Sequence, residues 1–253
     1  MIMTELNVVL LLADTQRSFV YVKSLCDENL RVSRVIFYSE DTFAPKSGST
    51  RTYKNFSKTD AVQKNNPPVK MFDYLNKITT NLIVINSSDV NSEAIFTQLQ
   101  LIDEDLIVFS GYPGQIVKKP LLEVGIPFLH IHCGSLPRYK GSTTIYYELL
   151  ETNQCAATAI LLDEKIDSGR IVGHQFYPKP TRGTDIDFKF DPEIRANLLV
   201  KVLKSHYAGN LSFLTQNEKL YFVNTYYVIH PLLKHLAVYG EEGLEMLRSN
   251  LKS

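Results

Sequence analysis

The most informative stretch of the sequence is HIHCGSLPRYKG, residues 130–141. Two histidines, His130 and His132, alternate at the end of an apolar run that begins at Phe128, and a loop that contains glycine and proline follows at once. Alternate residues of a β-strand project from the same face. In open α/β sheets, ligands bind beyond the carboxyl ends of the strands. The stretch therefore predicts a buried strand that presents two imidazoles to a binding site.

On the N-terminal side of this strand, short apolar runs alternate with segments of helical character. The predicted strands are residues 6–13, 34–38, 82–86, 106–110 and 128–132, and the predicted helices are residues 16–27, 68–78 and 92–101. Near-continuous apolar runs are typical of strands buried on both faces, and their alternation with helices favours a parallel sheet. The predicted fold class is therefore α/β, with a Rossmann-like, mostly parallel sheet. The first strand leads into Ala13-Asp14-Thr15-Gln16-Arg17 and not into G-x-G-x-x-G, so the dinucleotide-binding fingerprint is absent.

The character of the sequence changes after about Pro180. We predict an N-terminal catalytic domain at residues 1–182 and a small C-terminal α+β extension at residues 183–253. Within the extension we expect a helix at residues 193–206, a strand-like piece at residues 219–223 and a helix at residues 232–239. Residues 39–67 are polar and predict a long loop, with one short helix at most, that either lies over a binding face or is an insertion without a role.

Composition limits the possible partners. The 253 residues carry 27 basic and 27 acidic side chains, so the chain lacks the positive charge typical of proteins that bind nucleic acid or an anionic membrane. The three cysteines are too few and too widely spaced for a disulfide framework or a zinc ribbon. The apolar run at residues 8–13 is too short to span a bilayer. We therefore expect a cytoplasmic protein without a nucleic-acid or membrane partner.

A second polar element, DEKIDSG at residues 163–169, follows a strand-like stretch at residues 158–162. A histidine suits proton exchange near neutral pH, and a carboxylate beside it fixes the tautomer and favours the imidazolium. The plain alternative is that a buried histidine is a core residue. The H-x-H pair also suggests a zinc-dependent barrel hydrolase. In such barrels the pair comes early, whereas only about 120 residues follow His132 here.

Together, the two elements resemble the signature N-x-H-x-S-L-L-P-x-Y-R-G and the later D-x-G element of the folate-dependent formyltransferases. That family includes glycinamide ribonucleotide transformylase, methionyl-tRNA formyltransferase and the bacterial sugar N-formyltransferases. The resemblance is strongest over about residues 105–175 and implies the formyltransferase fold. It places His132 on the catalytic histidine and Asp167 on the catalytic aspartate. It also implies transfer of a formyl group from N10-formyltetrahydrofolate to an amine, without a metal.

The resemblance implies a division of roles. His132 would handle the proton and stabilise the oxyanion, with Asp167 as its orienting partner. The family's asparagine, two residues before the catalytic histidine, is His130 here. In the family, this asparagine donates a hydrogen bond to the formyl oxygen as negative charge develops on it. A histidine can also donate a hydrogen bond, so we expect the role of the asparagine to survive with an added pH dependence. The alternatives are a different acceptor or lost activity, and we favour retained function with His130 as a second catalytic donor.

Further site residues follow from the same resemblance. The segment 111–117 is similar to the family's pterin-binding loop, and the loop after the later strand adds two more positions. The predicted donor-binding residues are Tyr112, Gly114, Gln115, Ile116, Leu162 and Asp163, and the predicted substrate-binding residues are Lys140, Ser142 and Thr143. Asp163 can equally cap a turn, and the last three can simply shape their loop. Cys133 is expected to pack, because nothing indicates a lowered thiol pKa.

The acceptor is predicted by elimination. Methionyl-tRNA formyltransferases carry a larger, basic C-terminal domain, and glycinamide ribonucleotide enzymes are shorter and lack this tail. The element Asp191-Pro192-x-x-Arg195 and the tyrosine-rich run before His230-Pro231 resemble sugar-modifying members. We therefore expect an amino sugar, nucleotide-linked or on a nonulosonic (pseudaminic-type) acid pathway, used in bacterial surface glycan synthesis by a homodimer. The alternatives are another small amine, such as a ribonucleotide, and a non-catalytic folate-fold binding module.

Overall fold

The computed structural model of the protein describes residues 3–40, 50–53, 67–216 and 223–240. Its strands are β1 (Thr4–Ala13), β2 (Leu30–Ser39), β3 (Thr50–Tyr53), β4 (Leu82–Asn86), β5 (Leu106–Ser110), β6 (Phe128–Cys133), β7 (Tyr139–Gly141), β8 (Cys155–Leu161), β9 (Ile171–Tyr177) and β10 (Asn224–Tyr226). Its helices are α1 (Gln16–Asp27), α2 (Pro67–Ile78), α3 (Glu93–Leu99), α4 (Lys119–Leu122), α5 (Thr144–Thr152), α6 (Asp191–Tyr207) and α7 (Pro231–Tyr239), with a single π-helical turn η2 (Ile186–Phe190) before α6.

Within the described residues, eight strands form one mixed sheet in the order β3-β4-β2-β1-β5-β6-β8-β9. The five strands from β4 to β6 are mutually parallel, whereas β3, β8 and β9 each run antiparallel to a neighbour. The predicted mostly parallel α/β sheet is confirmed. The strand order reverses between β1 and β5, which makes the carboxyl ends of these two strands a topological switch point.

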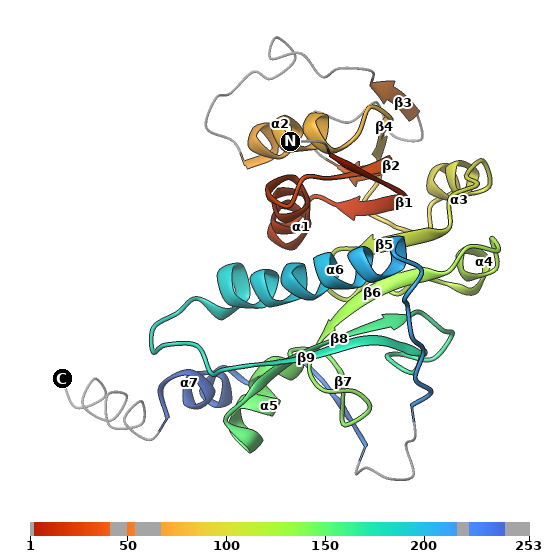
Figure 1. Cartoon of the computed structure of the whole chain (residues 1–253). Helices are drawn as coiled ribbons and strands as arrows, with labels where there is room; N and C mark the ends of the chain where they lie inside the picture. Colours follow the sequence, from red (N-terminus) through yellow and green to blue (C-terminus); the bar gives the residue numbers. More distant parts are fainter. Residues whose placement is uncertain (1–2, 41–49, 54–66, 217–222, 241–253) are drawn as a thin grey trace.

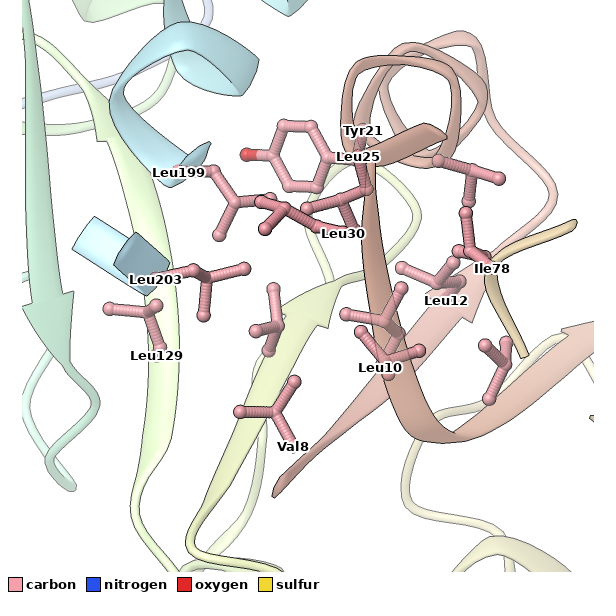
Figure 2. Close-up of a cluster of buried hydrophobic side chains, with 14 of the residues drawn as sticks. Val8, Leu10, Leu12, Tyr21, Leu25, Leu30, Ile78, Leu129, Leu199 and Leu203 are labelled. Carbon is pink, nitrogen blue, oxygen red and sulfur yellow. The ribbon is translucent and has the colours of Figure 1, made fainter. Parts of the chain in front are cut away.

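Helices cover both faces of the sheet (Figure 1). Helices α1, α2 and α6 pack on one face, and α3 and α4 pack on the other. Strand β1 is buried on both sides, so that Leu10 belongs to the first core and Leu11 to the second. Figure 2 shows the first core, where Leu199 and Leu203 of α6 lie on the same side of the sheet as Leu10.

The observed bounds agree closely with the predictions for the apolar segments. The helix predicted at residues 16–27 is α1, and Thr15 caps it by accepting a hydrogen bond from the backbone N–H of Ser18. The strand predicted at residues 34–38 is longer than expected, because Leu30 and Val32 are also buried. Strand β9 was not predicted, because six of its seven residues are exposed or only partly buried and polar residues interrupt its apolar pattern.

The C-terminal part meets the sheet through α6. This helix comes shortly after the predicted domain boundary at residue 182, yet its apolar side chains share a core with β1 and α1. The division at residue 182 therefore stays a prediction, and the packing of α6 ties the residues after it to the sheet. Most of the strand-like piece at residues 219–223 and of the polar segment 39–67 lies outside the described residues; within the latter, residues 50–53 form β3.

A second, two-stranded sheet joins β7 to β10, and it lies with α5 and α7 at one end of the molecule (Figure 1). The helix predicted at residues 232–239 is α7, which begins at Pro231 and packs against α5. Among the helices that the structure describes, none has both the length and the apolar character needed to cross a membrane.

Candidate active site

His132 lies at the carboxyl end of β6, where its backbone pairs with Thr158 of β8. Its side chain is only about 5% exposed, and both of its ring nitrogens face acceptors. Nε2 lies 2.7 Å from the carbonyl oxygen of Tyr139, and Nδ1 lies 3.4 Å from Oδ1 of Asp167. A doubly protonated imidazole satisfies both contacts, whereas a neutral ring satisfies only one of them. The predicted pair of His132 and Asp167 is thus brought together.

Asp167 lies in the loop between β8 and β9, and its backbone has a positive φ of 50°. Its Oδ2 accepts a hydrogen bond from the backbone N–H of Gly141 at 2.8 Å. Burial alone would raise the pKa of the Asp167 carboxyl, but the His132 ring and the hydrogen bonds to this carboxylate outweigh burial and hold the pKa well below its ordinary value. The carboxylate is therefore ionised at neutral pH and available as a charged partner for His132.

The loop around Asp167 is held from the C-terminal side by Gln216. The Gln216 amide nitrogen donates to the carbonyl oxygens of Asp167 at 2.9 Å and Gly169 at 2.8 Å. A side chain at Gly169 would overlap the carbonyl oxygen of Leu161, which explains why a glycine stands here in the D-x-G element. Gln216 was not predicted, because it lies far along the chain and reaches the loop only through the pairing of Leu214 with Ile171.

His130 projects from the same face of β6 as His132 but has different surroundings. Its Nδ1 lies 3.4 Å from the carbonyl oxygen of Phe109, and the side chain is half-buried. Burial, together with the positive charges of Arg17 and Arg195, lowers the pKa of His130 to about 3. His130 is therefore neutral near pH 7 and offers a single N–H, in contrast to a cationic ring with two.

In the segment after β5, hydrogen bonds hold Gln115 in place, whereas Gly114 and Ile116 form an open tip of the loop. The side-chain oxygen of Gln115 accepts hydrogen bonds from the Tyr38 hydroxyl at 2.6 Å and the Tyr112 N–H at 3.1 Å, and its amide nitrogen donates to the Ser88 carbonyl. Gln115, predicted to bind the donor, thus holds this loop against β2, where the Tyr112 ring also packs edge-on against Tyr38. Ile116 is 56% exposed, and the space around Gly114 is open.

The two remaining predicted donor-binding residues differ in exposure. Leu162 packs against the second core, and its N–H donates to the carbonyl of Phe128 at 2.7 Å. Asp163 is exposed, and its Oδ1 accepts from the backbone N–H of Glu164 at 2.6 Å. The turn-capping alternative for Asp163 is therefore present in the structure.

The predicted substrate residues lie directly after β7 or within it. Lys140 is only 5% exposed, and its ammonium group donates to the Ser168 hydroxyl at 2.6 Å, next to Asp167. Ser142 has an exposed side chain, while its backbone N–H donates to the Tyr226 carbonyl at 2.8 Å. The Thr143 hydroxyl donates to the Tyr227 carbonyl at 3.2 Å and accepts from the Ile229 N–H at 2.9 Å. Contacts within the protein thus occupy the hydroxyl of Thr143.

Two charged groups, the buried Glu148 and the largely buried Arg195, support β6 and its loop, and neither was predicted as a site residue. Arg195 of α6 contacts both oxygens of Asp191 at 2.9 Å and donates to the carbonyl of Ile131, the residue between the two histidines. Glu148 of α5 accepts from the N–H and hydroxyl of Ser135 and from the N–H of Ala156. Burial raises the pKa of Glu148 despite these hydrogen bonds. The sequence signals for Arg195 were its i, i+4 spacing from Asp191 and the Asp191-Pro192-x-x-Arg195 element.

Arg17 lies in the first turn of α1 at the topological switch point. It donates to the Ser110 hydroxyl at 3.2 Å and to the Gly111 carbonyl at 2.5 Å, both at the end of β5. It therefore joins α1 to the start of the loop predicted to bind the donor. In the part of the chain that the structure describes, no group of three or more His, Cys, Asp or Glu side chains is arranged to hold a metal ion.

Several curated proteins are similar in sequence to part of the chain. A methionyl-tRNA formyltransferase from Nitratiruptor sp. is 33% identical over 109 residues, which cover 43% of this chain and 35% of that protein. One from Methylacidiphilum infernorum is 30% identical over 140 residues, which cover 54% of this chain and 43% of that protein. The chain thus spans less than half the length of these two relatives.

Solved structures share the fold at low sequence identity. A sugar N-formyltransferase from Shewanella sp. superposes with a TM-score of 0.57 and 17% identity, over 91% of this chain and 86% of that one. An N-formyltransferase from Helicobacter canadensis, solved with folinic acid and dTDP-3-aminofucose, gives a TM-score of 0.51 and 15% identity, over 88% of this chain and 71% of that one. The profile of the family described as Formyl transferase matches residues 12–178, more than half of the sequence. The chain belongs to the formyl transferase family.

Proposed function

We propose that this protein transfers a formyl group from N10-formyltetrahydrofolate to the amine of a small amino sugar. The observation that carries the proposal is the pairing of His132 with Asp167 at the carboxyl end of β6. His130 lies two residues away on the same strand face, and Arg17 and the 111–117 loop lie at the neighbouring end of β5. This arrangement places proton-handling and hydrogen-bond-donating groups where open α/β sheets bind ligands.

The chemistry of these residues fits a formyl donor. Ring N–H groups of His130 and His132 suit the oxygen of a formyl group, and the open tip at Gly114 and the exposed apolar Ile116 offer a surface for an aromatic ring system. When bound, the folate would supply the activated one-carbon unit, and the protein would supply geometry and charge. Leu162 and Asp163 extend this proposed surface from the end of β8, and no metal enters the proposal.

The residues of this chain would carry three tasks. A donor already in place for the negative charge that develops on the formyl oxygen is commonly worth about 3–4 kcal/mol, and His132 would provide it once its Nε2 exchanges the Tyr139 carbonyl for substrate. Asp167 would hold the His132 ring through Nδ1 and favour its charged form. His130, being neutral, has one N–H, and it would take the place of the family's asparagine in the tautomer that carries this proton on Nε2 and not on the Nδ1 that faces the Phe109 carbonyl.

The acceptor class rests on separate support. Equal numbers of acidic and basic residues suit a small substrate better than a polyanionic RNA. The fold is similar over most of the chain to proteins described as sugar N-formyltransferases. We infer a nucleotide-linked amino sugar or an amino sugar of the nonulosonic acid type, contacted by Lys140 and Ser142, in a cytoplasmic enzyme of bacterial glycan synthesis that acts as a homodimer.

A second candidate acceptor is the amine of methionyl-tRNA. The observation in its favour is that the curated sequence relatives cited above are methionyl-tRNA formyltransferases. The neutral charge of the 253 residues speaks against it, because affinity for nucleic acid depends on basic side chains that neutralise phosphates.

The test is a formyl-transfer assay with parallel acceptors. The protein is mixed with N10-formyltetrahydrofolate and, separately, with amino sugar nucleotides, amino nonulosonic acids, glycinamide ribonucleotide and methionyl-tRNA. Tetrahydrofolate release and the mass of the product are measured. A formylated amino sugar supports the proposal, and a formylated methionyl-tRNA or ribonucleotide replaces its acceptor class. Donor binding without any product would favour a non-catalytic binding module.

A further inference from the structure

We propose that strand β10, from the C-terminal part of the chain, is a structural component of the catalytic unit, and that Thr143 is the positioning residue that locks it in place. The strand fixes the register of β7, whose backbone contacts both His132 and Asp167. This inference rests on the proposed function for its kinetic consequence, while its structural consequence can be measured without any activity.

The backbone of β7 connects the two catalytic side chains. At the start of this strand, the Tyr139 carbonyl lies 2.7 Å from Nε2 of His132. At its end, the Gly141 N–H donates to Oδ2 of Asp167 at 2.8 Å. A shift of β7 along its axis would therefore change the surroundings of both groups at once. Displacements of about 1 Å in an active site can cost about 10²-fold in rate.

The sheet partner of β7 is β10. The strands pair in parallel, with Asn224 opposite Tyr139 and Tyr226 opposite Gly141. The Ser142 N–H continues this pairing by donating to the Tyr226 carbonyl at 2.8 Å. Two strands of three residues each are marginally stable on their own. Their register therefore depends on contacts outside the ladder.

Gly141 and Tyr226 approach each other closely. Gly141 has a φ of 100°, and a side chain at this position would overlap the carbonyl oxygen of Tyr226. The ring of Tyr226 stacks on Tyr139, with ring centroids 5.6 Å apart, and also lies 4.4 Å from the ring of Tyr147 in α5. These contacts hold β10 against β7.

Thr143 fixes the position of β10 along the strand direction. Its hydroxyl donates to the Tyr227 carbonyl and accepts from the Ile229 N–H, so one side chain fixes two points of the segment that follows β10. Ile229 is 5% exposed and packs in a small core shared with α5 and α7. The segment is thus anchored at a buried residue on one side and paired with β7 on the other.

The test compares Thr143→Val with two matched variants. Valine keeps the β-branched shape and removes the hydroxyl, while Thr143→Ser keeps the hydroxyl. Thr152→Val makes the same substitution at the other end of α5, where the hydroxyl contacts the Glu148 carbonyl and the Gln154 N–H. Amide hydrogen exchange is followed at Ser142 and Ile229, and the ring nitrogen shifts of His132 are followed by NMR.

We expect Thr143→Val to accelerate exchange at both amides about fivefold or more, as loss of hydrogen bonds worth about 1 kcal/mol each would do. We also expect it to shift the His132 ring signals and to lower kcat about tenfold, with the donor KM within about twofold of wild type. Thr143→Ser should recover most of the exchange protection and the rate. Thr152→Val should leave the amides of Ser142 and Ile229 and the His132 signals as in wild type.

Three results would overturn the inference. One is unchanged exchange and unchanged His132 signals in Thr143→Val. Another is an increase confined to the acceptor KM, which would make Thr143 a substrate contact as the sequence suggested. The third is faster exchange with unaltered kcat, which would separate β10 from catalysis. If the wild-type protein transfers no formyl group, the proposed function fails, while the exchange and NMR comparisons still decide whether β10 positions His132.

Discussion

The two halves of the main sheet are stabilised in different ways. In the parallel half, β1, β2, β4 and β5 carry mainly apolar side chains that fill two cores. In the half that contains β6, β8 and β9, buried polar side chains gather around one strand end: His132, Lys140, Thr144, Glu148 and Thr158. Apolar burial is non-directional, whereas hydrogen bonds depend on distance and angle. The parallel half therefore sets the shape of the domain, and the second half sets the geometry around His132 and Asp167.

This comparison predicts that substitutions in the two halves change different measured quantities. Changes around β6 should lower the rate of formyl transfer while leaving a folded protein. Changes in the parallel half should lower the free energy of unfolding while leaving the rate per folded molecule unchanged.

The largest effect is expected for His132→Ala. This change removes the group proposed to handle the proton and to stabilise the developing negative charge, and it leaves Asp167 without its ring partner. We expect formyl transfer to fall by about 10³-fold or more. The circular dichroism spectrum should remain that of a folded α/β protein. Near-normal turnover in this variant would remove His132 from the mechanism.

Asp167→Asn is expected to rank next. The amide keeps the size of the side chain, but it loses the negative charge that faces Nδ1 of His132, and its NH₂ group can point at Nδ1 or at the Gly141 N–H. We expect kcat to fall by about 10²–10⁴-fold with the fold intact. The measurement is kcat at saturating donor and acceptor. A loss of less than about tenfold would make Asp167 a structural residue of its loop.

Leu10→Ala tests the other half of the comparison. Leu10 is fully buried in the first core, so its truncation leaves a cavity. We expect the free energy of unfolding to fall by about 2–5 kcal/mol, measured by urea denaturation. The kcat of the folded protein should equal that of wild type at a temperature below the unfolding transition. A large fall in kcat there would show that the two halves are not separable.

Among the substitutions at the site, His130→Asn is expected to have the smallest effect on rate, together with a specific effect on acid stability. The folded-state pKa of His130 is lowered to about 3, below an ordinary value of about 6.5. Between these values the unfolded chain binds the proton and the folded chain does not, so stability falls as pH falls through this window. Removing the histidine should therefore shift the acid-unfolding midpoint to lower pH.

His130→Asn restores the residue of the family signature, so we expect it to keep substantial formyl-transfer activity. An unmoved acid midpoint would show that His130 is not held neutral by its surroundings. Complete loss of activity would show that His130 has a role that an asparagine cannot fill.

The sequence predicted the parallel half better than the site. The runs at residues 82–86 and 106–110 became β4 and β5 with the predicted bounds, because burial on both faces requires unbroken apolar stretches. His132 and Asp167 were also predicted, because each stands in a short motif. The contacts of Gln216 and Thr143 were not predicted, because they join segments far apart in the chain and depend on backbone geometry that no local pattern specifies.

The most direct test of the central claim is a transfer experiment with a donor that carries a ¹³C-labelled formyl group. Wild-type protein and His132→Ala are incubated side by side with the labelled donor and the amino sugar panel, and the label is followed into the acceptor by NMR and mass spectrometry. The account predicts a ¹³C-formylated amino sugar with wild type and almost none with the variant. Equal labelling by both proteins, or donor binding by the wild type with no labelled acceptor, would contradict it.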